Sequence, residues 1–163
     1  SDRPLSELEA EIETMITAWK TEAYSTAWAY LERCAEAVES PGYLQNPFGR
    51  YRFFTQCDRD DIMSAQKREA QNFRIQSTVA DAVEIGMQLL VEYRANTNLQ
   101  FRMANQIHDA IKLQVREEEI DETKQALNET LGNVKIPIGS GCLKLGIDIT
   151  IMDRWGQKRK VKK

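Results

Sequence analysis

The sequence contains a single histidine, His108, and an aspartate, Asp109, follows it directly. Apolar residues on both sides of this pair recur at about every second position, namely Phe101, Met103, Ile107, Ile111, Leu113 and Val115. This spacing predicts two half-buried strands that meet at a His108–Asp109 turn. A carboxylate and an imidazole at the tip of a rigid hairpin suit a metal ligand and a group that contacts a substrate. The alternative is that the pair serves only as a turn, in which the aspartate bonds its own backbone.

Two further groups of polar side chains have spacings that suit a nucleic acid. Arg68 and Asn72 are four residues apart in a predicted helix, and Gln76 extends the row if the helix bends rather than ends. Donors in such a row match the minor-groove acceptors, which lie in nearly the same place in every base pair. Arg50 and Arg52 are predicted to share one face of a strand, where they suit phosphate contacts. Both groups are also compatible with an ordinary solvated surface.

Composition and charge restrict the class of protein. The chain has 163 residues, of which 42% are hydrophobic, so it can form a real core as one domain or as part of a larger one. The net charge of −3 argues against a surface that binds nucleic acid throughout, but the charge is uneven. Residues 1–40 hold nine acids and three bases, whereas residues 154–163 hold six bases and no acid and are predicted to be a disordered tail. The sequence has no apolar run of about 18 residues and no secretory signal, so no membrane contact is expected.

Apolar periodicity and the positions of proline and glycine divide the chain into elements. Helices are predicted over residues 5–39, with a break near Ser25, and over residues 58–72, 77–95 and 117–132. The helix over 77–95 is apolar nearly all round and is expected to be buried. Hairpins are predicted over 43–54 and 99–116, a loop over 136–141, and a last strand over 145–152 that joins the sheet. The expected fold class is therefore α+β, an antiparallel sheet packed against long helices.

Several elements occur together in the order and spacing of one enzyme family. The family's Q-V-H-D-E element reads Gln106-Ile107-His108-Asp109-Ala110 in this chain, and its E-R-x-x-x-N-x-P-x-Q-G-T-A-A-D element is matched from Lys67 to Asp81. Its G-Y-x-x-T-x-x-G-R-R-R-Y element is matched by Gly42-Tyr43 and by Gly49 to Phe53, and its terminal N-W by Arg154-Trp155 after Asp153. On these elements the chain resembles, over nearly its whole length, the C-terminal half of the polymerase domain of family A DNA polymerases. These are the bacterial DNA polymerase I type and its phage relatives.

The resemblance implies a palm-type antiparallel sheet with the His-Asp hairpin at its centre, in residues 41–153, preceded by a fingers-side helical segment in residues 1–40. It implies that Asp109 is one of two catalytic aspartates that hold two Mg²⁺ ions, and that His108 helps to place the primer terminus. It further implies DNA contacts from Arg50, Arg52, Arg68, Asn72, Gln76 and Gln106. The expected activity is template-directed nucleotidyl transfer to a primer 3′-OH, a reaction that depends mainly on positioning and charge neutralisation. Expected partners are primer-template DNA, a dNTP and the N-terminal part of the polymerase, in the cytoplasm of a bacterium or a phage-infected cell.

The chain also departs from the family pattern. Ala110 replaces a glutamate, Arg74 replaces a proline and Ser77 replaces a glycine. The family's other catalytic aspartate and its nucleotide-gripping fingers helix lie upstream of the matched segment. Because one carboxylate cannot hold two metal ions, we expect the chain to be inactive alone, as a fragment or as one piece of a split polymerase.

Three other interpretations compete with this one. A His-Asp metal phosphohydrolase needs several histidines, and His108 is the only one. A non-catalytic DNA-binding or assembly module with a polymerase-like fold is favoured slightly by Ala110 and by the acidic surface. A helical interaction protein without a nucleic-acid role does not account for the matched elements.

Overall fold

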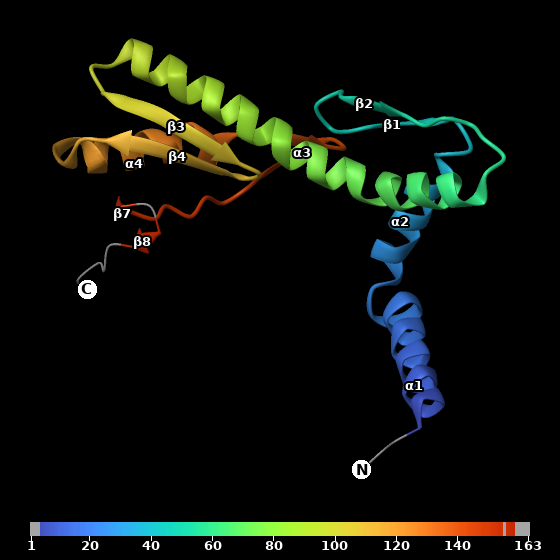
Figure 1. Cartoon of the computed structure of the whole chain (residues 1–163). Coiled ribbons are helices and arrows are strands. Elements are labelled where there is room, and N and C mark those ends of the chain that lie inside the picture. Colours follow the sequence, from blue (N-terminus) through green and yellow to red (C-terminus); the bar gives the residue numbers. More distant parts are fainter. Residues whose placement is uncertain (1–3, 155, 159–163) are drawn as a thin grey trace. The chain divides into compact units, whose positions relative to one another are not determined.

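The computed structural model describes residues 4–154 and 156–158. Helices alternate with short antiparallel strand pairs, which agrees with the predicted α+β class (Figure 1). The chain divides into two compact units, residues 1–75 and residues 76–163, and each is described by itself below.

The first unit begins with a broken helical segment. Helix α1 (Leu5–Ala18) runs into a π-helical turn, η1 (Trp19–Ala23), and helix α2 (Ser25–Glu36) follows. Tyr24 separates them because its backbone, at φ −133° and ψ 36°, leaves the helical region. This confirms the predicted break near Ser25.

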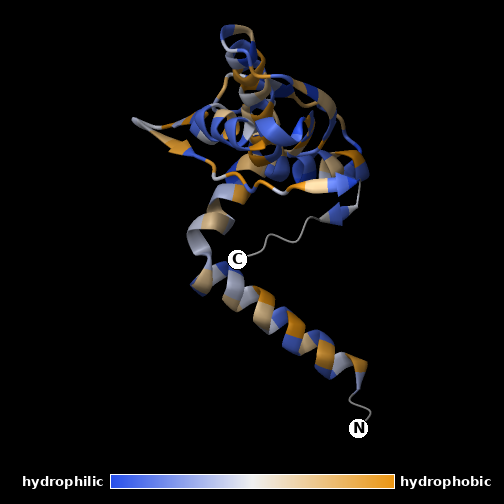
Figure 2. Cartoon of the chain, turned by 90° about the vertical axis from the view of Figure 1, so that its left-hand side faces the viewer, coloured by the Kyte–Doolittle hydropathy of each residue, from blue (hydrophilic) through white to orange (hydrophobic). Residues whose placement is uncertain are grey.

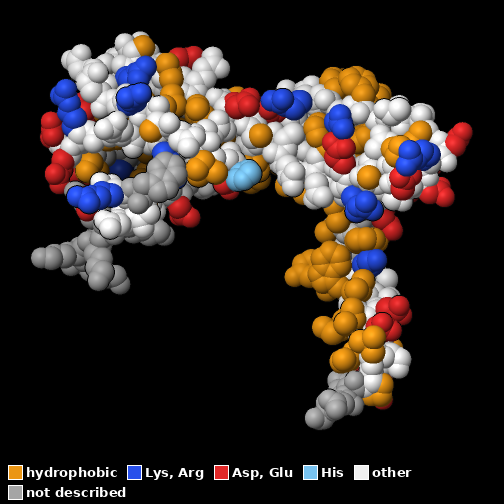
Figure 3. Space-filling view, in the orientation of Figure 1, with side chains coloured by type: hydrophobic (Ala, Val, Ile, Leu, Met, Phe, Trp, Pro, Cys, Tyr) orange, Lys and Arg blue, Asp and Glu red, His pale blue; other side chains and the backbone are white. Residues whose placement is uncertain are grey.

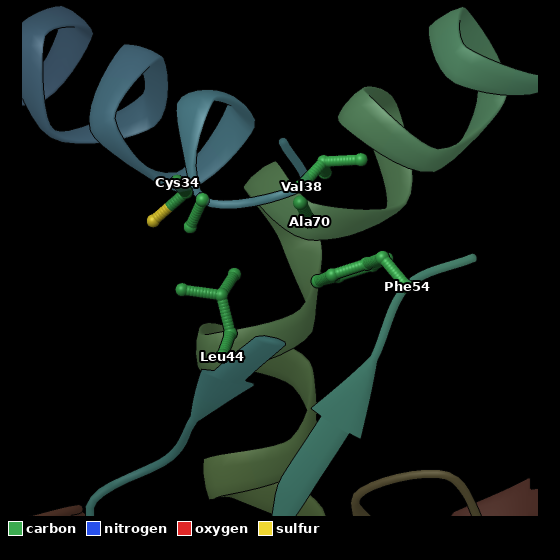
Figure 4. Packing of buried hydrophobic residues seen from close by; sticks show 6 residues of the cluster. Cys34, Val38, Leu44, Phe54 and Ala70 are labelled. Carbon is green, nitrogen blue, oxygen red and sulfur yellow. The ribbon is translucent and has the colours of Figure 1, made fainter. Parts of the chain in front are cut away.

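The core of the first unit lies between α2, a small hairpin and the start of helix α3. The hairpin pairs β1 (Tyr43–Gln45) with β2 (Tyr51–Phe53), as predicted for residues 43–54. Its buried side chain Leu44 and the adjoining Phe54 face the helices across a cluster drawn in Figure 4, which also contains Cys34, Val38 and Ala70. These side chains come from segments that are distant in sequence, so their burial fixes the hairpin onto the helices.

Helix α3 (Asp60–Asn96) is one continuous helix of 37 residues, which corrects the prediction of two helices over 58–72 and 77–95. The reason is local: Arg74 and Ser77 stand where the family has a proline and a glycine, and neither interrupts a helix. The expectation that the later part is buried all round is also wrong, because Leu89 and Val91 are each 37% exposed. Burial there follows mainly one face, which includes Ala82, Gly86 and Leu90 at spacings of four residues.

The core of the second unit joins the later part of α3 to a second hairpin and to helix α4 (Ile120–Glu129). The hairpin pairs β3 (Phe101–Ile107) with β4 (Ala110–Val115), and Leu90, Phe101 and Ala126 are fully or nearly fully buried in this core. The acidic helix predicted over 117–132 is shorter than expected. It begins with a 3₁₀ turn, η2 (Glu117–Glu119), and is followed by another, η3 (Leu131–Asn133).

A β-bulge changes the face of one predicted core residue. The pairing shifts between Met103 and Asn105, so that Gln106 lies opposite Ile111 and Ile107 lies opposite Ala110. Directly opposed residues share a face of the sheet, and one extra residue moves the following side chains to the other face. Ile107 is therefore 39% exposed, contrary to its prediction as part of the apolar stripe.

The strands do not join into one sheet. Residues predicted as a loop form a hairpin, β5 (Lys135–Ile138) with β6 (Gly141–Lys144), and β7 (Met152–Arg154) pairs with β8 (Gln157–Lys158). The predicted strand over 145–152 is absent before Met152, because residues 145–151 find no partner edge despite their alternating pattern. In the described residues, each strand pairs only with its neighbour in sequence, giving four two-stranded sheets instead of the palm-type sheet. Trp155 and the tail residues 159–163 lie outside the described residues.

Gly86 provides a test of the packing between α3 and η3. We expect Gly86→Ala to lower the free energy of unfolding by about 1–3 kcal/mol, as overpacking does, although alanine favours a helix. The reason is that a Cβ at Gly86 would lie 2.7 Å from Leu131 Cγ and 3.1 Å from Leu131 Cα. Chemical denaturation measures the change. Gly146→Ala is the matched control, since a Cβ there meets nothing within 4 Å; equal losses in both variants would contradict the prediction.

Candidate functional site

His108 and Asp109 occupy the two-residue turn between β3 and β4, as the sequence predicts. His108 has φ 53°, in the left-handed region that a hairpin turn of this length requires and that histidine adopts more readily than most residues. Gln106 Nε2 donates a hydrogen bond to the His108 carbonyl oxygen at 3.5 Å. Both turn side chains are exposed, and the histidine forms the pale-blue surface in Figure 3. The hairpin thus presents a carboxylate and an imidazole to solvent.

The described residues do not complete a metal site around Asp109. Among them, no group of three or more histidine, cysteine, aspartate or glutamate side chains is placed to hold an ion. Mg²⁺ is held in proteins by one or two carboxylates together with water and substrate phosphates. Asp109 therefore offers one carboxylate ligand that is not part of such a group.

The three polar residues predicted to read a minor groove all lie in α3 and are exposed. Arg68 and Asn72 belong to the first unit and Gln76 begins the second. Asn72 Nδ2 donates to the Arg68 carbonyl oxygen at 3.1 Å, so this amide is partly engaged by its own helix. The sequence left open whether the helix ends before Gln76. Because α3 is continuous, Gln76 lies in the same helix as Asn72, four residues further on.

Of Arg50 and Arg52, which are predicted to share one strand face, only Arg52 lies within the strand. Arg50 precedes β2, whereas Arg52 lies in its middle. Arg52 makes a bidentate contact with Glu69 of α3, with Nε and Nη2 at 2.8 Å and 3.0 Å from the two carboxylate oxygens. The hydrogen bond and charge of Glu69 raise the pKa of Arg52 above its usual value. No local sequence pattern indicates this pair, because Glu69 is 17 residues from Arg52 along the chain.

Comparisons with known proteins identify the family. The family model described as DNA polymerase family A matches residues 5–157. The chain belongs to this family.

Family A relatives match the chain over most of its length, although the chain spans only about 13% of theirs. DNA polymerase I of Pseudomonas aeruginosa is 24% identical over 130 residues, which is 78% of this chain and 13% of that protein. The thermostable DNA polymerase I of Thermus filiformis is 30% identical over 107 residues, which is 64% of this chain and 13% of that protein.

Part of a solved POL domain has a similar fold. The POL domain of Pol1 from M. smegmatis, in complex with DNA primer-template and dNTP, superposes with a TM-score of 0.73 at 22% identity. The match covers 85% of this chain and 25% of that one. None of the helices in the described residues has the length and apolar character needed to cross a membrane.

Proposed function

We propose that this chain is the C-terminal part of a DNA-directed DNA polymerase and that it cannot polymerise alone. The observation that carries the proposal is an exposed carboxylate, Asp109, fixed on a hairpin turn of a family A chain, in whose described residues no group of three or more potential ligands is placed to hold a metal ion. The reaction is transfer of a nucleotide from a dNTP to the primer 3′-OH, directed by a template strand.

Each of the predicted site residues has a role in this proposal. Asp109 supplies one ligand to a Mg²⁺ ion, and His108 contacts the primer terminus. Two Mg²⁺ ions would stabilise the attacking 3′-oxygen and the triphosphate, and the other ligands come from the upstream part of the enzyme. DNA contacts come from the remaining predicted residues, which are Gln106, Arg68, Asn72, Gln76, Arg50 and Arg52. Arg52 has to exchange its Glu69 partner for a phosphate or contact DNA with its remaining N–H groups.

Helix α1 supports the need for an upstream partner. Its apolar side chains recur at spacings of three and four, at Leu5, Leu8, Ile12 and Met15, yet no residue of α1 is buried. The recurrence is visible along the α1 ribbon in Figure 2 and as a continuous apolar band over α1 in Figure 3. Such a stripe is typical of a helix that packs against another helix. We propose that the N-terminal part of the polymerase covers it.

A reconstitution experiment tests the proposal. This chain is mixed with a family A polymerase fragment that carries the upstream aspartate and the fingers but lacks its own C-terminal part. We expect Mg²⁺-dependent extension of a labelled primer only when both are present. Extension by this chain alone would contradict the claim that it is incomplete. No extension by the mixture, when the two chains co-elute in gel filtration, would contradict its function as a polymerase part.

The salt dependence of DNA binding is a separate prediction. We expect weak binding of a primer-template duplex, with log K falling against log salt by about 0.9 per phosphate contact. Arg68→Ala is expected to weaken binding and, if Arg68 touches a phosphate, to reduce this slope by about 1. Arg59→Ala is the matched control, because Arg59 is exposed in the same unit and pairs with Asp61. Fluorescence anisotropy measures both, and equal effects of the two substitutions would exclude a specific contact by Arg68.

A second candidate function is a non-catalytic DNA-binding or assembly module with the polymerase fold. Ala110 beside Asp109 and the absence of a metal-binding group in the described residues favour it. Reconstitution separates the two functions, since the module would bind duplex DNA and restore no extension.

A further inference from the structure

Helix α1 and the start of η1 present a continuous row of apolar side chains. These side chains recur at spacings of three and four residues, and each is at least 38% exposed. We call this row the α1 stripe; it consists of Leu5, Leu8, Ile12, Met15, Ile16 and Trp19. Spacings of three and four make the heptad pattern of a helix that packs lengthwise against another helix. The shape of the α1 stripe therefore fits a helical partner.

Helix α1 gains little stability from the rest of this chain. It has 14 residues, all of which the structure describes, and none of them is buried. Isolated helices shorter than about 12–15 residues are marginal in water, because most helical stability in proteins comes from packing of an apolar face. A partner on the α1 stripe would supply that packing.

The charges of α1 indicate what kind of helix this partner is. The helix contains no lysine or arginine, and its glutamates are Glu7, Glu9, Glu11 and Glu13. At about 3.6 residues per turn, Glu9 and Glu13 border one side of the α1 stripe and Glu11 borders the other. Acidic side chains are visible beside the apolar band over α1 in Figure 3. The next base along the chain, Lys20, has its Nζ 4.1 Å from the centroid of the Trp28 ring.

We infer that the α1 stripe is covered by a helix that carries lysine or arginine on both sides of its own apolar stripe. This inference rests on the proposed function, in which the upstream part of the polymerase packs against α1, and it names the charge of the packing element. Charges that flank the apolar positions select the partner in paired helices. A second copy of this chain fits poorly, because the glutamates of the two copies would repel each other. A lipid surface also fits poorly, since helices that lie on membranes are typically rich in lysine and arginine.

Two synthetic peptides of about three heptads each test the inference. Both have the same apolar stripe, but one has lysines on both sides of it and the other has glutamates. Fluorescence anisotropy of each labelled peptide measures its binding to the full chain at low salt. We expect the lysine peptide to bind at least about tenfold more tightly than the glutamate peptide, because several exposed ion pairs add up to that difference. This preference should shrink as salt is added, since salt screens exposed charges.

Charge reversal in α1 tests whether the peptide binds there. We expect the double variant Glu9→Lys/Glu13→Lys to bind the lysine peptide about fivefold or more weakly, because two attractions become repulsions. Lysine and glutamate favour a helix almost equally, so α1 should be retained. Glu32→Lys/Glu36→Lys is the matched control and should leave binding unchanged. Its glutamates are also exposed and four residues apart, but they lie on α2 of the same unit.

A substitution in the α1 stripe completes the test. Ile12→Ser should weaken binding of the lysine peptide and leave the fold intact, because Ile12 is 54% exposed. Equal binding of the two peptides, binding of neither, or equal effects of the two charge-reversed variants would overturn the inference. So would self-association of the chain that Ile12→Ser abolishes. No polymerisation is measured, so failure of the peptide preference leaves the role of Asp109 unaffected, and failure of reconstitution leaves the peptide preference standing.

Discussion

Replacing Asp109 with asparagine is expected to reduce primer extension by the reconstituted polymerase by more than about 100-fold, because even outer-shell partners of metal ligands are typically worth 10- to 100-fold. Asparagine keeps the size of the side chain and removes the negative charge that we propose binds the ion. Since Asp109 is exposed at a turn, the free energy of unfolding should change by less than about 0.5 kcal/mol.

The control for this prediction is Asp148→Asn, which removes another exposed carboxylate from the same unit. It should leave extension unchanged. Single-turnover primer extension at saturating Mg²⁺ and dNTP measures both variants. Extension by the Asp109→Asn protein at the unchanged rate would remove Asp109 from the reaction.

The largest effect on stability is expected from Leu90→Ala. Leu90 is fully buried in the second unit, against Leu99, Phe101 and Ala126. Removing a buried leucine side chain usually lowers the free energy of unfolding by about 2–5 kcal/mol, because it loses apolar burial and leaves a cavity.

The neighbouring Leu89→Ala is the matched control for Leu90→Ala. Leu89 is 37% exposed on the same helix, so its substitution should lower the free energy of unfolding by clearly less. Urea denaturation followed by circular dichroism gives the comparison. Similar losses in the two variants would mean that the core is not centred on Leu90.

Local sequence signals predicted the hairpin of the candidate site well. Alternating apolar residues on both sides of His108-Asp109 define two strands and a two-residue turn, and the structure has the turn at that pair. The position of Ile107 was not predicted, because a bulge depends on how the two strands pair and leaves no local pattern. The prediction that the strands join into one sheet was also wrong. Pairing between hairpins depends on partners that are distant in sequence and leaves no local pattern.

The first hairpin shows a different limit. Alternation assigns Tyr51 and Phe53 to one face and Arg52 to the other, but it does not say which face points to the core. The outcome depends on Glu69 and Phe54, which hold Arg52 on the inner side. For α3, the continuous helix follows from Arg74 and Ser77, and their departure from the family pattern was the signal that the expected helix break would be missing.

The position of the metal ion decides whether Asp109 is a metal ligand. Fe²⁺ substitutes for Mg²⁺ in the reconstituted complex with primer-template DNA, and ascorbate with peroxide then generates hydroxyl radicals that cleave the polypeptide near the ion. We expect cleavage of this chain around His108 and Asp109, and loss of that cleavage in the Asp109→Asn variant. Cleavage confined to other segments, or unchanged in that variant, would contradict it.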